Sequence, residues 1–139
     1  MADLTTLTTS GFQRLGEWQH GPEHGPHGVG WGFSCPATPG VYAFAVDGAV
    51  MYIGSAQRGL RTRLRQYTGS TTLRTAARVR AEIIAALSAG STVEVYALTP
   101  PQIEWRGLPV DLVAGIEEGL IRTLRPAWNR RSNRGTLPR

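Results

Sequence analysis

The chain has 139 residues and a mass of 15.1 kDa, the length of one ordinary domain. A hydrophobic content of 41% is enough for a compact core and excludes a disordered chain. No apolar run reaches the ~18 residues of a membrane span, and the first residues do not resemble a secretion signal. The single cysteine cannot form an internal disulfide, so we expect a cytoplasmic protein without a membrane partner.

The charge is basic and unevenly distributed. Fifteen arginines, with no lysine, stand against ten acidic residues and give a net charge of +5. Thirteen of these arginines fall in two segments that contain no acidic residue, 58–80 and 122–139. Such segments attract polyanions, and the planar guanidinium suits phosphate. Charge alone therefore favours a nucleic acid as partner over the alternative of solvated helix faces.

The first 38 residues differ in composition from the rest. Residues 19–40 are rich in glycine and proline, which break regular structure, so we expect an irregular arm or long loop after a short helix or strand near 11–18. This arm also contains three histidines and the cysteine, at a spacing that fits no standard structural zinc site. A loop that follows DNA or assists dimerisation is favoured over zinc binding for these residues: His20, His24, His27 and Cys35.

A regular pattern begins after the arm. Residues 41–46 are β-branched and aromatic, Asp47-Gly48 is a strong hairpin turn, and 50–54 returns as a second strand. Alternation predicts a third strand over 92–98, and apolar spacing predicts helices over 59–66, 72–88 and 110–124. This order predicts a small α/β domain of the α+β type, in which helices flank a three-stranded, mainly antiparallel sheet.

Several side chains match the needs of phosphodiester hydrolysis, which are a base for water, a fixed cation and a metal held by a carboxylate. Tyr42 and Tyr52 lie on the two strands of the predicted hairpin. Arg63 lies on the first predicted helix, and Tyr67 follows four residues later on the same face. Glu117 lies beside apolar positions of the last helix. Each alone has a structural alternative, such as a packed core tyrosine, so the combination carries the hypothesis.

Five segments, taken in order, resemble the GIY-YIG nuclease family. The match covers about residues 39–130 and looks most similar to the N-terminal nuclease domain of bacterial excision-repair endonucleases and to GIY-YIG restriction enzymes. It implies a nuclease-like domain at 39–130, with an N-terminal arm at 1–38 and a basic tail at 131–139. The matching segments are Gly40-Val41-Tyr42, Tyr52-Ile53-Gly54, residues 60–67, Glu117-Glu118-Gly119-Leu120-Ile121-Arg122, and Pro126 with Asn129.

The resemblance implies a role for each candidate catalytic residue. Tyr42 is expected to act as the general base or as a hydrogen-bond partner of the attacking water. Tyr52 is expected to position the water or the phosphate, and Tyr67 also suits the water. Arg63 is expected to hold the phosphate and stabilise its developing charge. Glu117 is expected to bind one divalent ion, Mg²⁺ or Mn²⁺.

Two further positions follow from the resemblance. Asn129 is expected to support the geometry of the site, and Ser55 departs from the family because many members have lysine there. Seven of the other arginines are expected to contact DNA, and they are Arg61, Arg65, Arg74, Arg78, Arg80, Arg130 and Arg131.

The resemblance and the charge together predict a metal-dependent endonuclease that hydrolyses phosphodiester bonds in double-stranded DNA. No separate recognition module is visible, so we expect either a homodimer or a separate targeting protein. Two alternatives remain: a catalytically weak or inactive DNA-binding module on the same scaffold, and a nuclease that acts on RNA.

Overall fold

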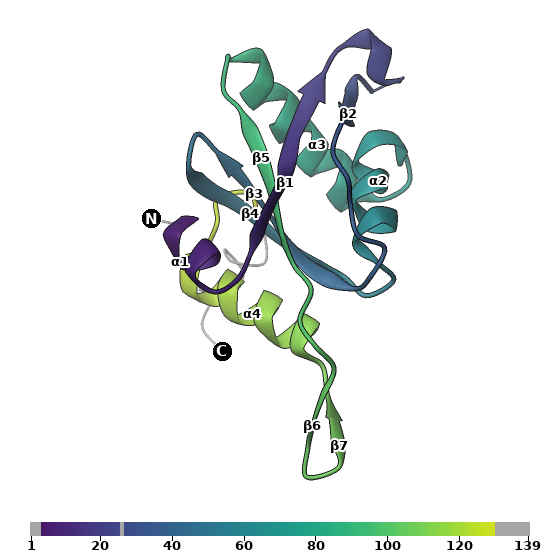
Figure 1. Cartoon of the computed structure of the whole chain (residues 1–139). Helices are drawn as coiled ribbons and strands as arrows, with labels where there is room; N and C mark the ends of the chain where they lie inside the picture. The colour runs from purple at the N-terminus through teal and green to yellow at the C-terminus, as the bar shows by residue number, and fades with distance from the viewer. Residues whose placement is uncertain (1–3, 26, 130–139) are drawn as a thin grey trace.

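The computed structural model describes residues 4–25 and 27–129. In this part of the chain no helix combines the length and the apolar character needed to cross a bilayer. Figure 1 shows a central sheet with helices on both sides and a hairpin that projects from the body. The elements, in chain order, are α1 (Leu4–Thr9), β1 (Gln13–His20), the short 3-10 helix η1 (Pro22–His24), β2 (Val29–Trp31), β3 (Gly40–Val46), β4 (Ala49–Ala56), α2 (Leu60–Gly69), α3 (Arg74–Ser88), β5 (Val93–Leu98), β6 (Ile103–Trp105), β7 (Leu108–Val110) and α4 (Leu112–Leu124).

The main sheet contains five strands in the order β2-β1-β5-β3-β4, and all of these neighbours pair antiparallel. β3 and β4 form the predicted hairpin. Its turn residues Asp47 and Gly48 have φ angles of 49° and 89°, which suit a type I′ turn. The three predicted helices and the strand predicted over 92–98 are present, with ends displaced by a few residues. The α+β class and the antiparallel sheet are thus confirmed.

The prediction of three strands is wrong, because two further strands join the sheet. β1 lies where a short helix or strand was expected near 11–18, and β2 lies inside the segment expected to be irregular. β1 carries Trp18, which is 1% exposed and packs edge-on against Trp31 and Phe33. Glycine at this point permits close packing, since a Cβ on Gly16 would lie 2.7 Å from the Phe33 ring. Gly16 therefore lets an aromatic ring approach the backbone of β1.

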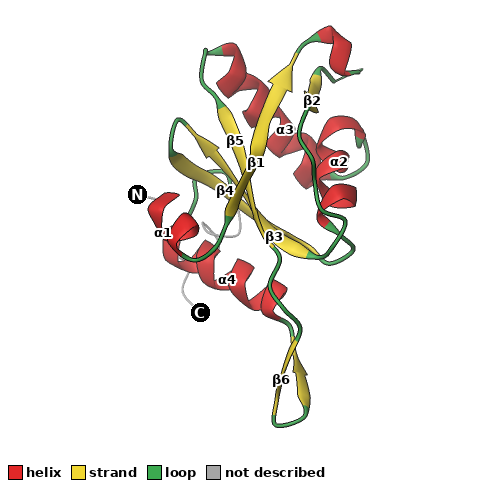
Figure 2. Ribbon diagram, viewed as in Figure 1, coloured by secondary structure: helices red, strands yellow, loops and turns green. Residues whose placement is uncertain are grey.

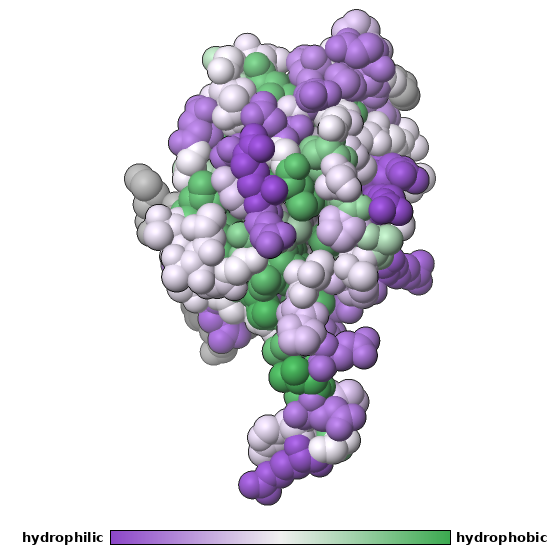
Figure 3. Space-filling model, in the orientation of Figure 1, coloured by the Kyte–Doolittle hydropathy of each residue, from purple (hydrophilic) through white to green (hydrophobic). Residues whose placement is uncertain are grey.

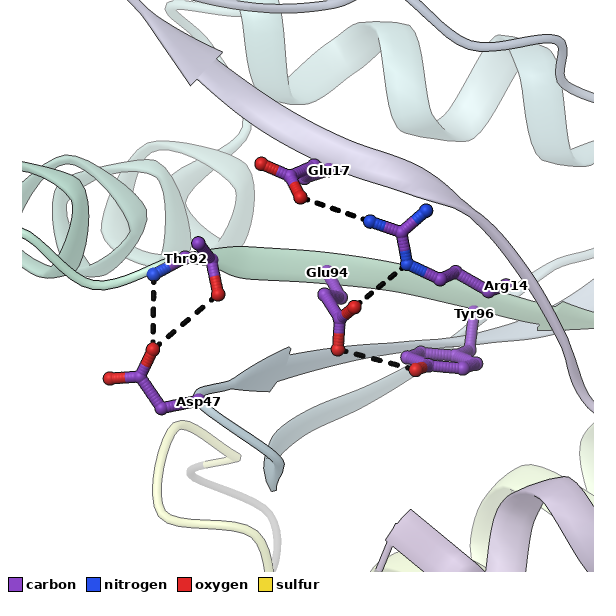
Figure 4. Close-up of polar contacts among 6 residues, drawn as sticks. All are labelled: Arg14, Glu17, Asp47, Thr92, Glu94 and Tyr96. Atoms are coloured by element: carbon purple, nitrogen blue, oxygen red, sulfur yellow. Dashed lines mark hydrogen bonds and ion pairs between the residues drawn. The ribbon is translucent and has the colours of Figure 1, made fainter.

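Polar side chains join β1 to β5 on the surface of the sheet (Figure 4). Arg14 donates from Nε to Glu94 at 2.7 Å and from Nη2 to Glu17 at 2.9 Å. The Tyr96 hydroxyl donates to the other carboxylate oxygen of Glu94 at 3.2 Å. Exposed ion pairs contribute only about 0–1 kcal/mol each, so this network helps to set the pairing of β1 while buried Trp18 supplies the larger stabilisation.

The two faces of the sheet are covered by different helices, α2 and α3 on one side and α1 and α4 on the other (Figure 2). Side chains alternate along β3, because successive strand residues point to opposite faces. Tyr42 and Phe44 belong to the core beneath α2 and α3, whereas Val41 and Ala43 belong to the core beneath α1 and α4. β3 is therefore buried on both faces over most of its length.

β6 and β7 form a separate two-stranded sheet, called here the ribbon, which projects from the body just before α4 (Figure 1). Its turn residues Arg106 and Gly107 have φ angles of 53° and 83°, again those of a type I′ turn. No strand was predicted between 98 and 110. Pro100-Pro101 marks the end of the strand predicted over 92–98 and gives no sign of the ribbon that follows.

Candidate active site

The three signature tyrosines meet on the face of the sheet covered by α2 and α3. Their ring centroids lie 6.2 Å apart for Tyr42 and Tyr52, 6.0 Å for Tyr42 and Tyr67, and 6.5 Å for Tyr52 and Tyr67. The hydroxyls of Tyr42 and Tyr67 are 2.6 Å apart and share a hydrogen bond. Tyr42 pairs across the hairpin with Gly54 and Tyr52 with Phe44, so the two strand tyrosines are diagonal neighbours.

Arg63 joins this cluster from α2. Its Nε donates to the Tyr42 hydroxyl at 3.2 Å, and its guanidinium carbon lies 5.6 Å from the Tyr67 ring centroid. A second bond, from Nη1 to Gln66 Oε1 at 2.6 Å, fixes the orientation of the guanidinium. Sequence reasoning does not single out Gln66, although its i, i+3 spacing from Arg63 places both on one helix face. Tyr42 and Tyr67 are fully buried, so Arg63, which is half-buried, connects the cluster to solvent.

Burial sets the protonation of this cluster. It raises the pKa of both Tyr42 and Tyr67 above their ordinary value of 10.0, and the nearby Arg63 cation opposes the rise only in part. Burial also disfavours the Arg63 cation, but the neighbouring phenol oxygens outweigh that effect and raise its pKa. At neutral pH the group therefore consists of neutral hydroxyls beside a guanidinium that stays charged.

The glycines of the two signatures are required by this packing. A Cβ on Gly54 would lie 2.5 Å from the ring carbon Cζ and the hydroxyl of Tyr42, so only glycine allows that ring to cross β4. A Cβ on Gly40 would lie 2.6 Å from the Leu98 carbonyl oxygen and 2.9 Å from Leu60 Cδ1. Both glycines thus place the phenol ring and the helix α2 against the hairpin.

Glu117 lies on α4 and contacts β4 from the opposite face of the sheet. Its Oε1 accepts a hydrogen bond from Ser55 Oγ at 2.9 Å. Ser55 directly follows Gly54, and successive strand residues point to opposite faces, so the Glu117 carboxylate lies on the side of β4 away from the Tyr42 ring. The serine that stands at the position of a family lysine therefore contacts the candidate metal ligand directly.

Asn129 completes the free edge of β4. Its Oδ1 accepts from the Ile53 N–H and its Nδ2 donates to the Ile53 carbonyl, both at 2.8 Å. The neighbouring Trp128 N–H donates to the Met51 carbonyl at 2.8 Å, so the chain after α4 runs along this edge. Asn129 is 4% exposed. Its two hydrogen bonds hold the backbone of the second signature at Ile53.

The donor set around Glu117 fits a magnesium-type ion. Mg²⁺ is commonly bound by one or two carboxylates, with water and substrate phosphate as the other ligands. Glu117 is half-buried and has the Ser55 hydroxyl beside it. Within residues 4–25 and 27–129, no three His, Cys, Asp or Glu side chains lie close enough to share an ion.

The arginines predicted to contact DNA differ in exposure. Arg61 and Arg65 on α2 and Arg74 at the start of α3 are exposed and available to a polyanion. Arg78 is half-buried and donates from Nη1 to the Trp128 carbonyl at 2.8 Å. Its DNA contact stays a prediction, and Arg130 and Arg131 lie outside the described residues.

Arg80 requires a correction. It is 7% exposed, and its Nη1 donates to the Tyr67 carbonyl at 3.1 Å. Burial lowers the pKa of its guanidinium. The predicted DNA contact is wrong, because this side chain points into the core and ties α3 to the turn of α2 that carries Tyr67.

Comparison with known proteins gives structural relatives. A mutant of bacteriophage T4 EndoII aligns with a TM-score of 0.72 and 21% identity, over 93% of this chain and 99% of that one. The restriction endonuclease HPY188I in complex with product DNA aligns with a TM-score of 0.54 and 16% identity, over 99% of this chain and 90% of that one. The N-terminal GIY-YIG endonuclease domain of UvrC from Thermotoga maritima, bound to its catalytic magnesium, aligns with a TM-score of 0.47 and 25% identity, over 68% of this chain and 86% of that one.

The sequence matches no protein-family model and no curated protein. The assignment of the fold therefore rests on three-dimensional similarity together with the two signatures on β3 and β4. By these criteria the chain has a GIY-YIG nuclease-like fold.

Proposed function

We propose that this chain is a divalent-metal-dependent endonuclease that hydrolyses phosphodiester bonds in double-stranded DNA. The observation that carries the proposal is the cluster of the buried Tyr42 and Tyr67 with the half-buried Arg63, with oxygen–oxygen and nitrogen–oxygen distances of 2.6 and 3.2 Å. Clusters of buried titratable groups with strongly shifted pKa values are concentrated at functional sites. The shared fold with HPY188I, a restriction endonuclease in complex with product DNA, supports DNA as the substrate.

Arg63 is the residue that receives the phosphate in this proposal. It is the half-buried member of the cluster, and its two side-chain bonds use two of the five N–H donors of a guanidinium. Because Gln66 and Tyr42 already hold it, little reorganisation is needed when negative charge builds up on the phosphate. Such preorganised charge is the largest source of catalysis in many enzymes.

Tyr42 and Tyr67 orient the attacking water through neutral hydroxyls. Their raised pKa values oppose a standing phenolate at neutral pH, so Tyr42 serves as a hydrogen-bond partner of the water, and not as a preformed base. The hydrogen bond between the two oxygens fixes the orientation of both hydroxyls. Tyr52 packs against both rings and limits their movement.

Glu117 is the residue that would hold the metal ion, with its orientation fixed by Ser55. A bound Mg²⁺ supplies Lewis-acid polarisation of the scissile phosphate and lowers the pKa of water. Asn129 holds the backbone of β4 at Ile53 by its paired hydrogen bonds, between the strand residues that contact the tyrosine cluster and Glu117.

One observation favours a second candidate, a DNA-binding module with weak or no catalysis. Tyr42 and Tyr67 are both fully buried, so a water molecule reaches their hydroxyls only if Arg63 or its neighbours move. The same basic surface would then bind DNA without cutting it.

Plasmid cleavage by Glu117→Gln tests the proposal. We expect the wild-type chain to cut supercoiled plasmid in Mg²⁺ or Mn²⁺, and Glu117→Gln to lose at least about 100-fold in rate, since the carboxylate that would hold the metal ion is removed. Glu118→Gln is the matched control, because it removes the same charge one residue away and should retain most of the activity. Fluorescence anisotropy with a labelled duplex should show DNA binding by all three proteins.

Each other result points to a different conclusion. Full cleavage by Glu117→Gln would contradict its assignment as the metal ligand. Binding of duplex by the wild type without cleavage in either metal would establish the inactive module. Cleavage of a labelled RNA of the same sequence, with the DNA left intact, would establish an RNA-directed nuclease.

A further inference from the structure

A polar pair lies in the largely apolar contact between α4 and β4. Glu117 is half-buried, and its Oε1 is 2.9 Å from the Ser55 Oγ. Figure 3 shows hydrophobic surface where the ribbon joins the body, next to the start of α4. The helix residues around Glu117 that belong to or pack against the core beneath α1 and α4 are Val113, Ile116, Leu120, Ile121 and Leu124. A hydroxyl and a carboxylate therefore meet in mostly apolar surroundings.

The pairing of β4 places Ser55 on the side of the sheet that α4 covers. Ser55 lies opposite Val41 of β3, and residues opposite each other in an antiparallel pair share a face. Val41 belongs to the core beneath α1 and α4. Just after the strand, Gln57 donates from Nε2 to the Asp111 carboxylate at 2.9 Å, and Asp111 caps the first turn of α4. The strand and the helix are thus joined at two points, which fixes the spacing of the Ser55 and Glu117 oxygens.

Both oxygens are hard donors of the kind that Mg²⁺ accepts. Carboxylates bind this ion in many proteins, and a serine or threonine hydroxyl binds it in phosphate-binding loops. A hydroxyl oxygen has two lone pairs besides its hydrogen, so the Ser55 Oγ can accept a cation once its hydrogen turns away from Glu117. A charged lysine, which many family members have at this position, offers no lone pair.

The distance between the two oxygens fits two neighbouring ligands of one ion. Adjacent ligands of an octahedral Mg²⁺, each about 2.0–2.1 Å from the ion, lie about 2.8–3.0 Å apart. The Ser55 and Glu117 oxygens are 2.9 Å apart. The same spacing serves a hydrogen bond without the ion and two ligands with it. An ion can therefore bind without a shift of the strand or of the helix.

We propose that the Ser55 hydroxyl is a second protein ligand of the divalent ion, beside the Glu117 carboxylate. The proposal rests on the function proposed above, because that function requires the ion. The two side chains occupy adjacent positions of the octahedron, and water and substrate phosphate occupy the others. Because Ser55 acts on the reaction through the ion, its loss should weaken metal binding and leave duplex binding unchanged.

Binding of Mn²⁺ in the absence of DNA tests the assignment without the use of nuclease activity. Electron paramagnetic resonance measures free Mn²⁺, so a titration gives the dissociation constant of each variant. Ser55→Ala should raise this constant at least about 10-fold, since loss of even an outer partner of a metal ligand costs about 10–100-fold. Glu117→Gln should raise it at least as much. Ser10→Ala is the matched control, because the Ser10 hydroxyl donates to a backbone carbonyl at 2.8 Å. Circular dichroism should show that all three variants are folded.

A cysteine at this position distinguishes a metal ligand from a residue that only orients Glu117. Thiolates select soft ions such as Cd²⁺, and the bond between them absorbs ultraviolet light. Ser55→Cys should therefore give a thiolate-to-metal absorption band with one equivalent of Cd²⁺, and addition of Glu117→Gln should weaken it. Ser10→Cys is the control for a cysteine placed elsewhere on the chain. Cys35 is present in every variant, so its contribution cancels.

Two results would overturn the assignment of Ser55 alone. The first is an unchanged Mn²⁺ dissociation constant in Ser55→Ala when Glu117→Gln binds Mn²⁺ weakly. The second is the absence of a Cd²⁺ band in Ser55→Cys, which would leave Ser55 the role of orienting Glu117. A wild-type chain that binds no Mn²⁺ would overturn both this assignment and the metal dependence of the proposed function. A wild-type chain that shows the expected Mn²⁺ and Cd²⁺ results but cuts no plasmid would support the ion site and contradict the proposed function.

Discussion

At the scale of single residues, the hydroxyls of Tyr42 and Tyr67 are the most unusual groups in the core. Both belong to fully buried side chains, and each is the other's hydrogen-bond partner at 2.6 Å. Burial raises the pKa of both above 10.0. A phenol whose folded pKa exceeds its unfolded pKa loses its proton more readily when the chain unfolds. Its contribution to stability is therefore complete below pH 10 and declines as the pH rises above that value.

This linkage predicts alkaline destabilisation. The free energy of unfolding of the wild-type chain should fall above about pH 10, by up to about 1.4 kcal/mol per pH unit for each buried hydroxyl. Tyr42→Phe and Tyr67→Phe should each fall less steeply. The chain has no lysine, so few other groups titrate in this range. Urea denaturation at a series of pH values measures the slopes.

The unfolding measurements below about pH 9 serve as the reference for those above pH 10. Below about pH 9 both phenols are neutral in the folded and unfolded states, so the slopes of wild type and variants should agree there. Parallel slopes above pH 10 would show that the two hydroxyls are not buried in solution.

At the scale of elements, the β3–β4 hairpin depends on a glycine that faces an aromatic ring. Gly54 lies opposite Tyr42, and a side chain there would occupy the position of the phenol. Gly54→Ala should therefore destabilise the fold by about 1–3 kcal/mol, the usual cost of overpacking, and displace Tyr42. Thermal denaturation measures the change.

Gly119→Ala is the matched variant for this experiment. Gly119 lies in α4 with no atom within 4 Å of an added Cβ, so alanine should stabilise that helix by roughly 0.5–1 kcal/mol. Equal melting temperatures for the two variants would contradict the requirement for glycine in β4.

The strands that the sequence did and did not predict differ in their local signals. The β3–β4 hairpin has β-branched residues and an Asp-Gly turn, which determine it without help from distant contacts. β1 and β2 are held by long-range packing of Trp18 against Trp31 and Phe33. The glycines in and near these strands leave no clear strand pattern in the sequence. β7 contains Pro109, and proline is tolerated where a strand lies at an edge.

The candidate site was predictable to the extent that its residues follow local spacing. Arg63 and Tyr67 share a helix face, and the structure brings both to Tyr42. The bond from Ser55 to Glu117 joins residues far apart in the sequence, so no local pattern indicates it. Arg80 resembles its exposed neighbours in sequence, and only the packing of α3 against α2 shows that it is buried.

At the scale of the whole molecule, two surfaces of different chemistry stand apart. The exposed arginines of α2 and α3 suit a phosphate backbone, whereas the ribbon is neutral and apolar. The ribbon leads directly into α4, which carries Glu117. The surface that suits phosphate and the apolar surface therefore come from different parts of the chain, the first from α2 and α3 and the second from the segment just before α4.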